Sequence, residues 1–111
     1  MYRQGDIVKV PFPLSDDTGS KVRPAIIISN KAVNDTQDVV MAQITAKPRN
    51  DAFSFFLKNE DMDTPLPCPS QVRCHKITVI QKTKIIKHIS RLKVEKQREL
   101  LAKITALLHV Y

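Results

Sequence analysis

The side chains with the greatest capacity for chemistry in this chain are two arginines, a histidine and a threonine. Arg23 stands where a polar loop sequence meets an apolar run, and Thr45 ends a second apolar run. Arg73 and His75 are two residues apart, so on a β-strand they are predicted to share one face. Guanidinium groups, a hydroxyl and an imidazole together suit phosphate-ester chemistry, in which charge is stabilised and a proton is transferred. No metal is needed when a 2′-hydroxyl of RNA is the nucleophile.

The same residues also have a structural interpretation. Arg23 would form an ion pair at a strand edge with an acidic residue of the preceding loop, and Thr45 has the β-branched side chain common in strands. On composition alone, both interpretations remain open.

Other chemistries fit the sequence less well. Gly5 and Gly19 are the only glycines and neither belongs to a phosphate-binding loop, which disfavours nucleoside-triphosphate chemistry. Cys68 and Cys74 lack the paired short spacings of a zinc site and are expected to be free thiols in a reducing cytoplasm. A catalytic pair of Cys74 and His75 is disfavoured because neighbours on a strand point to opposite faces. We therefore expect no metal and no cofactor.

Positive charge is concentrated in one part of the chain. The 111 residues carry 18 Lys and Arg against 11 Asp and Glu, a net charge of +7. Residues 71–93 hold seven basic residues and no acidic residue, whereas residues 1–70 hold eight basic and nine acidic ones. Such a local field is either a solvated basic face or a track for a phosphate backbone. Nucleic acid is therefore the partner class that the charge favours.

Apolar patterning predicts five short strands followed by one helix. The expected strands cover residues 7–12, 23–30, 39–45, 53–57 and 76–80. The second is almost continuously apolar, which predicts a central place in the sheet. Leucines and isoleucines at helical spacing predict an amphipathic helix over residues 94–109. This order suits a mainly β, small antiparallel sheet or barrel with a C-terminal helix, folded as one domain over residues 1–111.

An ordered set of segments runs along almost the whole chain. The segments are GDIV at 5–8, GSKVRP at 19–24, AIIISN at 25–30, IT at 44–45 and SQVRCHKI at 70–77. This set resembles the PemK/MazF toxins of bacterial toxin–antitoxin pairs. The resemblance implies an SH3-like barrel with appended helices, a homodimer, and a metal-independent endoribonuclease inhibited by a cognate antitoxin. No membrane partner is expected, because no run approaches eighteen apolar residues.

The resemblance also implies roles for individual residues. Arg23 matches the family's Arg-Pro arginine and Thr45 its strand-end hydroxyl residue, the two positions most closely tied to cleavage. Arg73 matches a basic residue used for phosphate contact or acid catalysis. His75 stands where members commonly carry an aspartate that is a proposed base, and Ala46 stands where a second hydroxyl residue usually follows the threonine.

RNA contacts are expected from one aromatic residue and five lysines. Phe12 is the candidate for stacking on a base, whereas the phenylalanines within residues 53–56 are assigned to the core. The lysines expected to contact phosphate are Lys21, Lys47, Lys76, Lys82 and Lys84.

The implied reaction on single-stranded RNA is attack by the 2′-hydroxyl, which leaves a 2′,3′-cyclic phosphate and a 5′-hydroxyl. Two alternatives stay open, because a fold does not fix an activity. One is a catalytically silent member of the same fold that acts on a protein such as gyrase. The other is an RNA-binding barrel without chemistry, whose binding would depend strongly on salt.

Overall fold

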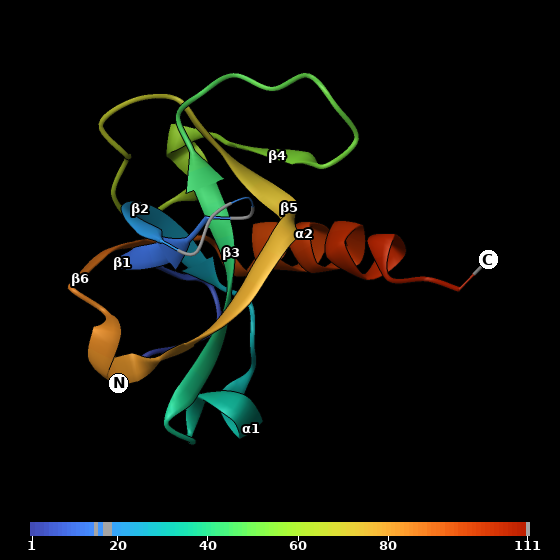
Figure 1. The fold of residues 1–111 in the computed structure, drawn as a ribbon. Helices are drawn as coiled ribbons and strands as arrows, with labels where there is room; N and C mark the ends of the chain where they lie inside the picture. Colours follow the sequence, from blue (N-terminus) through green and yellow to red (C-terminus); the bar gives the residue numbers. More distant parts are fainter. Residues whose placement is uncertain (15, 17–18, 111) are drawn as a thin grey trace.

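A six-stranded antiparallel sheet forms the centre of the computed structural model, which describes residues 1–14, 16 and 19–110 (Figure 1). The strands are β1 (Asp6–Pro13), β2 (Ser20–Ile27), β3 (Asp38–Thr45), β4 (Ser54–Leu57), β5 (Ser70–Gln81) and β6 (Lys87–Arg91). Across the sheet they follow the order β4-β5-β3-β2-β1-β6. The helical elements are α1 (Lys31–Asn34), α2 (Val94–Leu107) and the 3₁₀ turns η1 (Asn59–Asp61) and η2 (Lys82–Lys84). The predicted antiparallel β fold with a C-terminal helix is confirmed.

The predicted barrel is incomplete. Among the described residues no strand pairing joins the two edge strands, β4 and β6. The chain that follows β4 partly bridges this gap, because the Asp63 amide donates to the Arg91 carbonyl (2.9 Å) and the Lys93 amide donates to the Asp61 carbonyl (2.8 Å). The sheet is therefore curled, with its edges joined by main-chain hydrogen bonds of a loop.

Two strands differ from the sequence prediction. The patterning did not predict β6, because only Ser90 of its five residues is buried and its apolar alternation is weak. β5 begins at Ser70 and not at residue 76, because its first half buries polar side chains that hydropathy assigns to a loop. The second strand ends at Ile27, where Ser29 and Asn30 turn the chain into α1 and the Asn30 side chain caps that helix.

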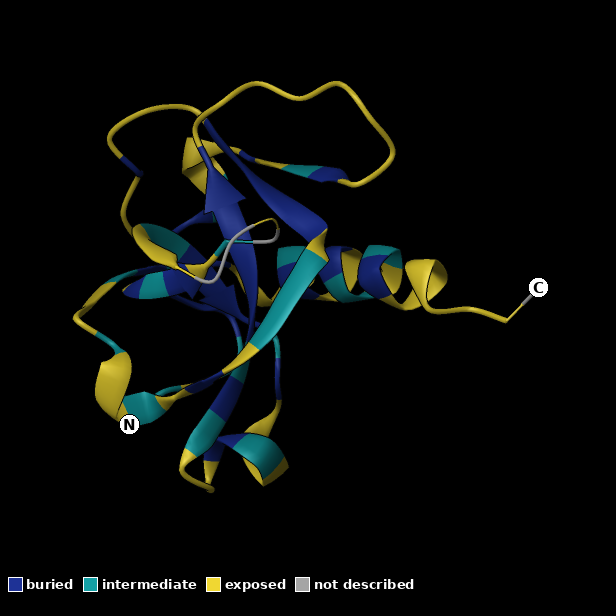
Figure 2. Ribbon diagram, viewed as in Figure 1, coloured by how far each residue is buried: buried dark blue, intermediate teal, exposed yellow. Residues whose placement is uncertain are grey.

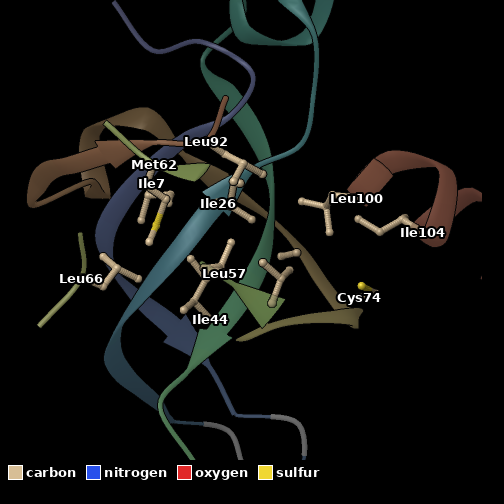
Figure 3. Close-up of a cluster of buried hydrophobic side chains, with 12 residues drawn as sticks. Ile7, Ile26, Ile44, Leu57, Met62, Leu66, Cys74, Leu92, Leu100 and Ile104 are labelled. Carbon is tan, nitrogen blue, oxygen red and sulfur yellow. The ribbon is translucent and has the colours of Figure 1, made fainter. Parts of the chain in front are cut away.

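Two hydrophobic clusters occupy the two faces of the sheet. On one face, Ile7, Ile26, Ile44 and Cys74 pack with apolar residues of α2 (Figure 3). The opposite cluster contains the alternate residues of the same strands: Val8, Val10, Phe12, Ala25, Ile27, Val39, Met41 and Ile80. β1, β2, β3 and β5 thus bury both faces for part of their length, which explains the near-continuous apolar runs.

The apolar side of α2 packs on the sheet while its other side faces solvent (Figure 2). Leu100 and Ile104 are the buried apolar residues, and the helix ends at Leu107, two residues before the predicted end. No helix in the described part of the chain is long and apolar enough to cross a membrane.

A close approach of backbone to side chain fixes the start of β1 against α2. Gly5 has a φ of +92°, and its carbonyl accepts a hydrogen bond from the Leu92 amide (2.9 Å). A Cβ atom at this position would lie 2.1 Å from Nε2 of Gln97, which itself donates to the Leu92 carbonyl (2.7 Å). Position 5 therefore favours glycine for its conformation, and a Cβ there would displace the side-chain amide of Gln97.

The pairing of β5 with β3 is interrupted by a bulge. Ala42 pairs with Ile77, but the next residue, Gln43, pairs with Arg73. Residues 74–76 therefore have no opposite partner on β3. The bulge changes the strand alternation on which the expected common face of Arg73 and His75 depended.

Candidate functional site

A cavity of about 710 Å³ lies where β2, β3 and β5 approach the loops that connect the strands. We call it the cationic cavity. Its lining residues are Leu14, Asp16, Lys21, Arg23, Gln43, Thr45, Ala46, Lys47, Arg49, Arg73 and Lys76. Six of the ten sequence-predicted site residues are among them: Lys21, Arg23, Thr45, Lys47, Arg73 and Lys76.

Strand register brings two predicted catalytic residues together. Ala25 of β2 pairs with Gln43 of β3 at the end of their ladder, and continuing this antiparallel register by two residues sets Arg23 opposite Thr45. The alternation of side chains places both on the sheet face of Ala25, opposite the face that α2 covers. An arginine and a hydroxyl thus line one cavity wall although 22 positions separate them in the sequence.

Both of these side chains retain unused hydrogen-bond donors. Nε of Arg23 is buried and has no hydrogen-bond partner among the described residues. Thr45 is 8% exposed, and its Oγ1 accepts a hydrogen bond from the Lys47 amide (3.1 Å). That bond uses a lone pair and leaves the hydroxyl proton of Thr45 available to donate. A buried donor without a partner is costly, and an anion in the cavity would satisfy it.

Arg73 is held rigidly by residues of the loop before β4 and of β4 itself. Its Nη1 and Nη2 donate to Oδ1 and Oδ2 of Asp51, both at 3.0 Å. Nη1 also donates to Oγ of Ser54 (2.7 Å), and Ser54 Oγ donates to Asp51 Oδ1 (3.0 Å). The hydrogen bond from Arg73 lowers the pKa of Asp51 to about 2. Asp51 is therefore ionised near neutral pH, and the guanidinium of Arg73 is oriented by a two-point contact.

The cations of the cavity come from three separate segments. Lys21 and Arg23 belong to β2, and Arg73 and Lys76 belong to β5. Lys47 and Arg49, which follow β3, complete the set of six. Asp16 is the one acidic residue among the described residues that line the cavity. This excess of positive charge fits a polyanionic ligand, and most of it lies outside the basic stretch 71–93.

His75 lies outside the cationic cavity, which corrects the expected common face of Arg73 and His75. Its ring packs against Phe53, with the ring centroids 4.6 Å apart. Because of the bulge at 74–76, Lys76 and not His75 lines the cavity beside Arg73. Partial burial, together with the positive charges of Arg73 and Lys76, lowers the pKa of His75. The imidazole is therefore neutral at pH 7.

Three predicted RNA contacts are also corrected. Phe12 is 3% exposed and belongs to the hydrophobic cluster on the face away from α2, so it has no surface for a base. Lys82 and Lys84 form η2 beyond the far end of β5, and Lys82 Nζ donates to the Asn34 carbonyl (2.9 Å). Eight residues of extended strand separate Arg73 from Gln81, roughly 26 Å. These two lysines therefore do not contribute to the cavity.

The phenylalanines of residues 53–56 are only partly in the core. Phe55 packs against the cluster under α2, but Phe56 is 62% exposed and Phe53 is also exposed. β4 is an edge strand, so its outward residues meet solvent.

Sequence reasoning missed the residues that orient and complete the site. Asp51, Ser54, Gln43, Arg49 and Asp16 were not singled out. Asp51 had a detectable signal, since it is an acidic residue two positions after the basic Arg49. The strand register that brings it to Arg73 is a tertiary feature with no local pattern.

Comparison with known proteins gives a family match across nearly the whole chain. The model of the PemK-like, MazF-like toxins of type II toxin–antitoxin systems matches residues 3–108. No curated protein matches the sequence.

Solved structures with the same fold include an endoribonuclease in complex with its cognate antitoxin from a mycobacterial species. It has 20% identity and a TM-score of 0.78, and the alignment covers 100% of this chain and 99% of that one. MazF from Deinococcus radiodurans has 18% identity and a TM-score of 0.78, with 96% of each chain covered. The Mycobacterium tuberculosis toxin MazF-mt6 has 22% identity and a TM-score of 0.70, with 94% of this chain and 99% of that one covered.

Proposed function

Because the chain belongs to the PemK-like, MazF-like toxin family of type II toxin–antitoxin systems, we propose that it is a toxin that cleaves single-stranded RNA. One observation carries the proposal. Arg23, Thr45 and Arg73, from three different strands, line the same cationic cavity. The cavity combines donors for a phosphoryl group with positive charge for the rest of the strand, which is what backbone cleavage requires.

In the proposed reaction the 2′-oxygen of a ribose forms a bond to the adjacent phosphorus, and the bond from phosphorus to the 5′-oxygen breaks. The products are a 2′,3′-cyclic phosphate and a 5′-hydroxyl. Arg23 and the hydroxyl of Thr45 donate to the non-bridging oxygens, on which negative charge grows in the transition state. Arg73 presents its guanidinium in a fixed position, because Asp51 and Ser54 hold it, although the ionised Asp51 offsets its charge.

A proton acceptor is needed for the attacking 2′-hydroxyl. Among the cavity-lining residues that the structure describes, Asp16 is the one carboxylate. We assign this role to Asp16 because His75 packs on Phe53 outside the cavity. The leaving 5′-oxygen takes a proton from one of the cavity cations or from water.

The proposal includes the partners and conditions that the family implies. The protein acts without a metal or cofactor, as a homodimeric single domain of the cytoplasm, and a cognate antitoxin inhibits it. The structural similarity to a mycobacterial endoribonuclease solved in complex with its cognate antitoxin supports the last point. The charge of the cationic cavity suits an acidic antitoxin segment.

RNA cleavage in the presence of EDTA tests the proposal. Purified protein is expected to cut a long RNA of mixed sequence, and Arg23→Ala is expected to lower the rate by about 10²-fold, the scale of losing one donor to the transition state. Arg98→Ala is the matched control, because Arg98 is exposed on α2 outside the cavity and the variant should cut at the normal rate. Salt-dependent binding of RNA that stays intact would refute the endoribonuclease and favour an RNA-binding barrel.

A further inference from the structure

Lys103 of α2 makes a hydrogen bond that the proposed reaction does not use. Its Nζ donates to the main-chain carbonyl of Ser54 (2.8 Å), 49 positions earlier in the chain. Leu100 and Ile104, within one turn of Lys103, anchor this part of α2 in the core. Lys103 is not among the described residues that line the cationic cavity. The helix therefore presents one ammonium group at a fixed place outside the site.

This hydrogen bond supports an edge strand. β4 pairs with β5 on one side and, in the described part of the chain, pairs with no strand on the other. The Cys74 amide donates to the Phe53 carbonyl (2.8 Å), so the main-chain groups of the next residue, Ser54, point towards the free edge. Lys103 supplies a donor to the carbonyl that the sheet leaves unpaired there. Removal of the ammonium is therefore expected to loosen the start of β4.

Ser54 joins this edge of the sheet to the cationic cavity. It stands opposite Arg73 in the ladder of β4 and β5, and it is buried. Its carbonyl accepts a hydrogen bond from Lys103, while its hydroxyl accepts one from Nη1 of Arg73 (2.7 Å). A shift of the Ser54 main chain thus moves an acceptor that orients the guanidinium.

Asp51, the other group that orients Arg73, depends on the same part of the chain. Residues 46–53 are all exposed, so no core packing fixes the loop that carries Asp51. Apart from Arg73, the described donors to its carboxylate are the Phe53 amide and the Ser54 hydroxyl, each at 3.0 Å. Both donors belong to the start of β4 or to the residue just before it. Asp51 and Ser54 are therefore expected to move together.

Resting on the proposed function, we propose that Lys103 is a positioning residue for RNA cleavage, which holds the start of β4 and thereby fixes the guanidinium of Arg73 without touching the RNA. The contacts run from Lys103 to the Ser54 carbonyl and from the Ser54 hydroxyl to Arg73. Orientation matters because a misplacement of about 1 Å in a reacting site can cost up to about 10²-fold in rate. The inference couples α2, which packs on one face of the sheet, to chemistry on the other face.

Substitution of Lys103 tests the inference through kinetics. Lys103→Met nearly keeps the length of the side chain and removes its donor. We expect kcat for an RNA that contains the mapped cut site to fall about 10-fold with KM nearly unchanged, because other bonds still hold Ser54 in part. Lys103→Arg restores a donor and should recover most of the rate.

Lys96→Met is the matched control. Lys96 lies on the same helix, pairs with Glu99 and is not among the described residues of the cavity, so the variant loses the same charge and should cut normally. An effect of Lys103→Met on KM alone, or an equal loss of rate in Lys96→Met, would show that charge attracts the RNA. Either result would overturn the positioning role.

A double-mutant cycle tests whether the effect passes through Arg73. Arg73→Met alone is expected to slow single-turnover cleavage. Adding Lys103→Met should cause no further loss, because the group that Lys103 positions is already gone. Losses that multiply would mean that Lys103 acts by another route and would overturn the inference.

NMR of the arginine side chains provides a readout that needs no RNA. A guanidinium held by a two-point contact rotates slowly, so Nη1 and Nη2 of Arg73 should give separate nitrogen signals in the wild type. Lys103→Met is expected to merge them into one averaged signal, whereas Lys103→Arg and Lys96→Met should keep them separate. Separate signals in all variants would overturn the link between Lys103 and Arg73, whatever the rates.

The two readouts distinguish this inference from the proposed function. Normal kcat in Lys103→Met beside an active wild type would overturn the positioning role and leave the endoribonuclease standing. Absence of cleavage by the wild type would overturn the proposed function, while the Arg73 signals would still report whether Lys103 fixes the guanidinium. A lower melting temperature of Lys103→Met with both Arg73 signals retained would indicate a general loss of stability, which would also overturn the inference.

Discussion

Replacing Thr45 by valine should separate catalysis from stability. Valine has nearly the shape of threonine and the same preference for strands, so β3 should keep its register. The change removes the hydroxyl, and with it the acceptor of the Lys47 amide (3.1 Å) and the proposed donor to a phosphoryl oxygen. The lost hydrogen bond affects the melting temperature and the lost donor affects the cleavage rate, and the two effects differ in size.

The expected stability loss is small. One neutral, partly buried hydrogen bond contributes about 1 kcal/mol. For a chain of this length the melting temperature should fall by about 4 °C or less. The expected catalytic loss is much larger: a missing donor to the transition state lowers the rate by about 10²-fold, which corresponds to about 2.7 kcal/mol.

Single-turnover cleavage of an RNA oligonucleotide that contains the mapped cut site is the appropriate assay, with melting followed by circular dichroism. Thr45→Ser retains the hydroxyl, so it is expected to cut at close to the wild-type rate. Its melting temperature should be similar to that of the valine variant. A valine variant that cuts within twofold of the wild-type rate would refute the role of the hydroxyl. An equal loss of rate in the serine and valine variants would show that packing, and not the donor, matters.

Three further predictions concern the framework of the fold and the acid–base groups. Gly5→Ala places a Cβ 2.1 Å from Gln97 Nε2 at a φ of +92° and is expected to cost about 2 to 3 kcal/mol, a fall in melting temperature of about 10 °C; an unchanged melting curve would contradict this. Asp51→Asn is expected to destabilise the protein at pH 5 but much less at pH 2. The reason is that a carboxyl whose folded pKa is lowered from 3.8 to about 2 stabilises the fold above pH 4 and loses that effect as pH falls through 2. Urea unfolding at the two pH values measures the free-energy difference between the variant and the wild type, and a difference that is the same at both pH values would contradict the prediction. Asp16→Asn is expected to slow RNA cleavage by about 10²-fold or more while His75→Ala cuts at nearly the normal rate, and the reverse result in the same gel assay would return the role of base to the histidine.

The sequence was sufficient to predict those parts of the site that follow from strand alternation and family motifs. Thr45 ends β3 and Arg23 lies within β2 just before its apolar run, and extending the register of Ala25 with Gln43 brings them opposite each other. Phe12 was misassigned although its parity with Val8 and Val10 indicates the buried face. The place of Phe12 in the strand alternation, and not its proximity to a loop, indicates that its side chain is buried.

The remaining errors have tertiary causes. The bulge at residues 74–76 depends on how β5 pairs with β3, and the hydropathy pattern of one strand alone does not show it. The contact of Asp51 with Arg73 spans 22 positions and arises because β4 pairs with β5. The distribution of charge indicated a basic stretch, but it does not show where each side chain lies. It therefore did not distinguish Lys76, which lines the cavity, from Lys84, which lies in η2 beyond the far end of β5.

The assembly of the cationic cavity from β2, β3 and β5 has a consequence for the timing of toxicity during synthesis. Arg23 and Lys76 line one cavity but are 53 positions apart in the sequence. A chain that has left the ribosome only as far as β3 carries the cations of β2 but lacks β5, which contributes Arg73 and Lys76 to the cavity. Under the proposed function, the nascent protein is harmless to the messenger that encodes it until most of its length has emerged and folded.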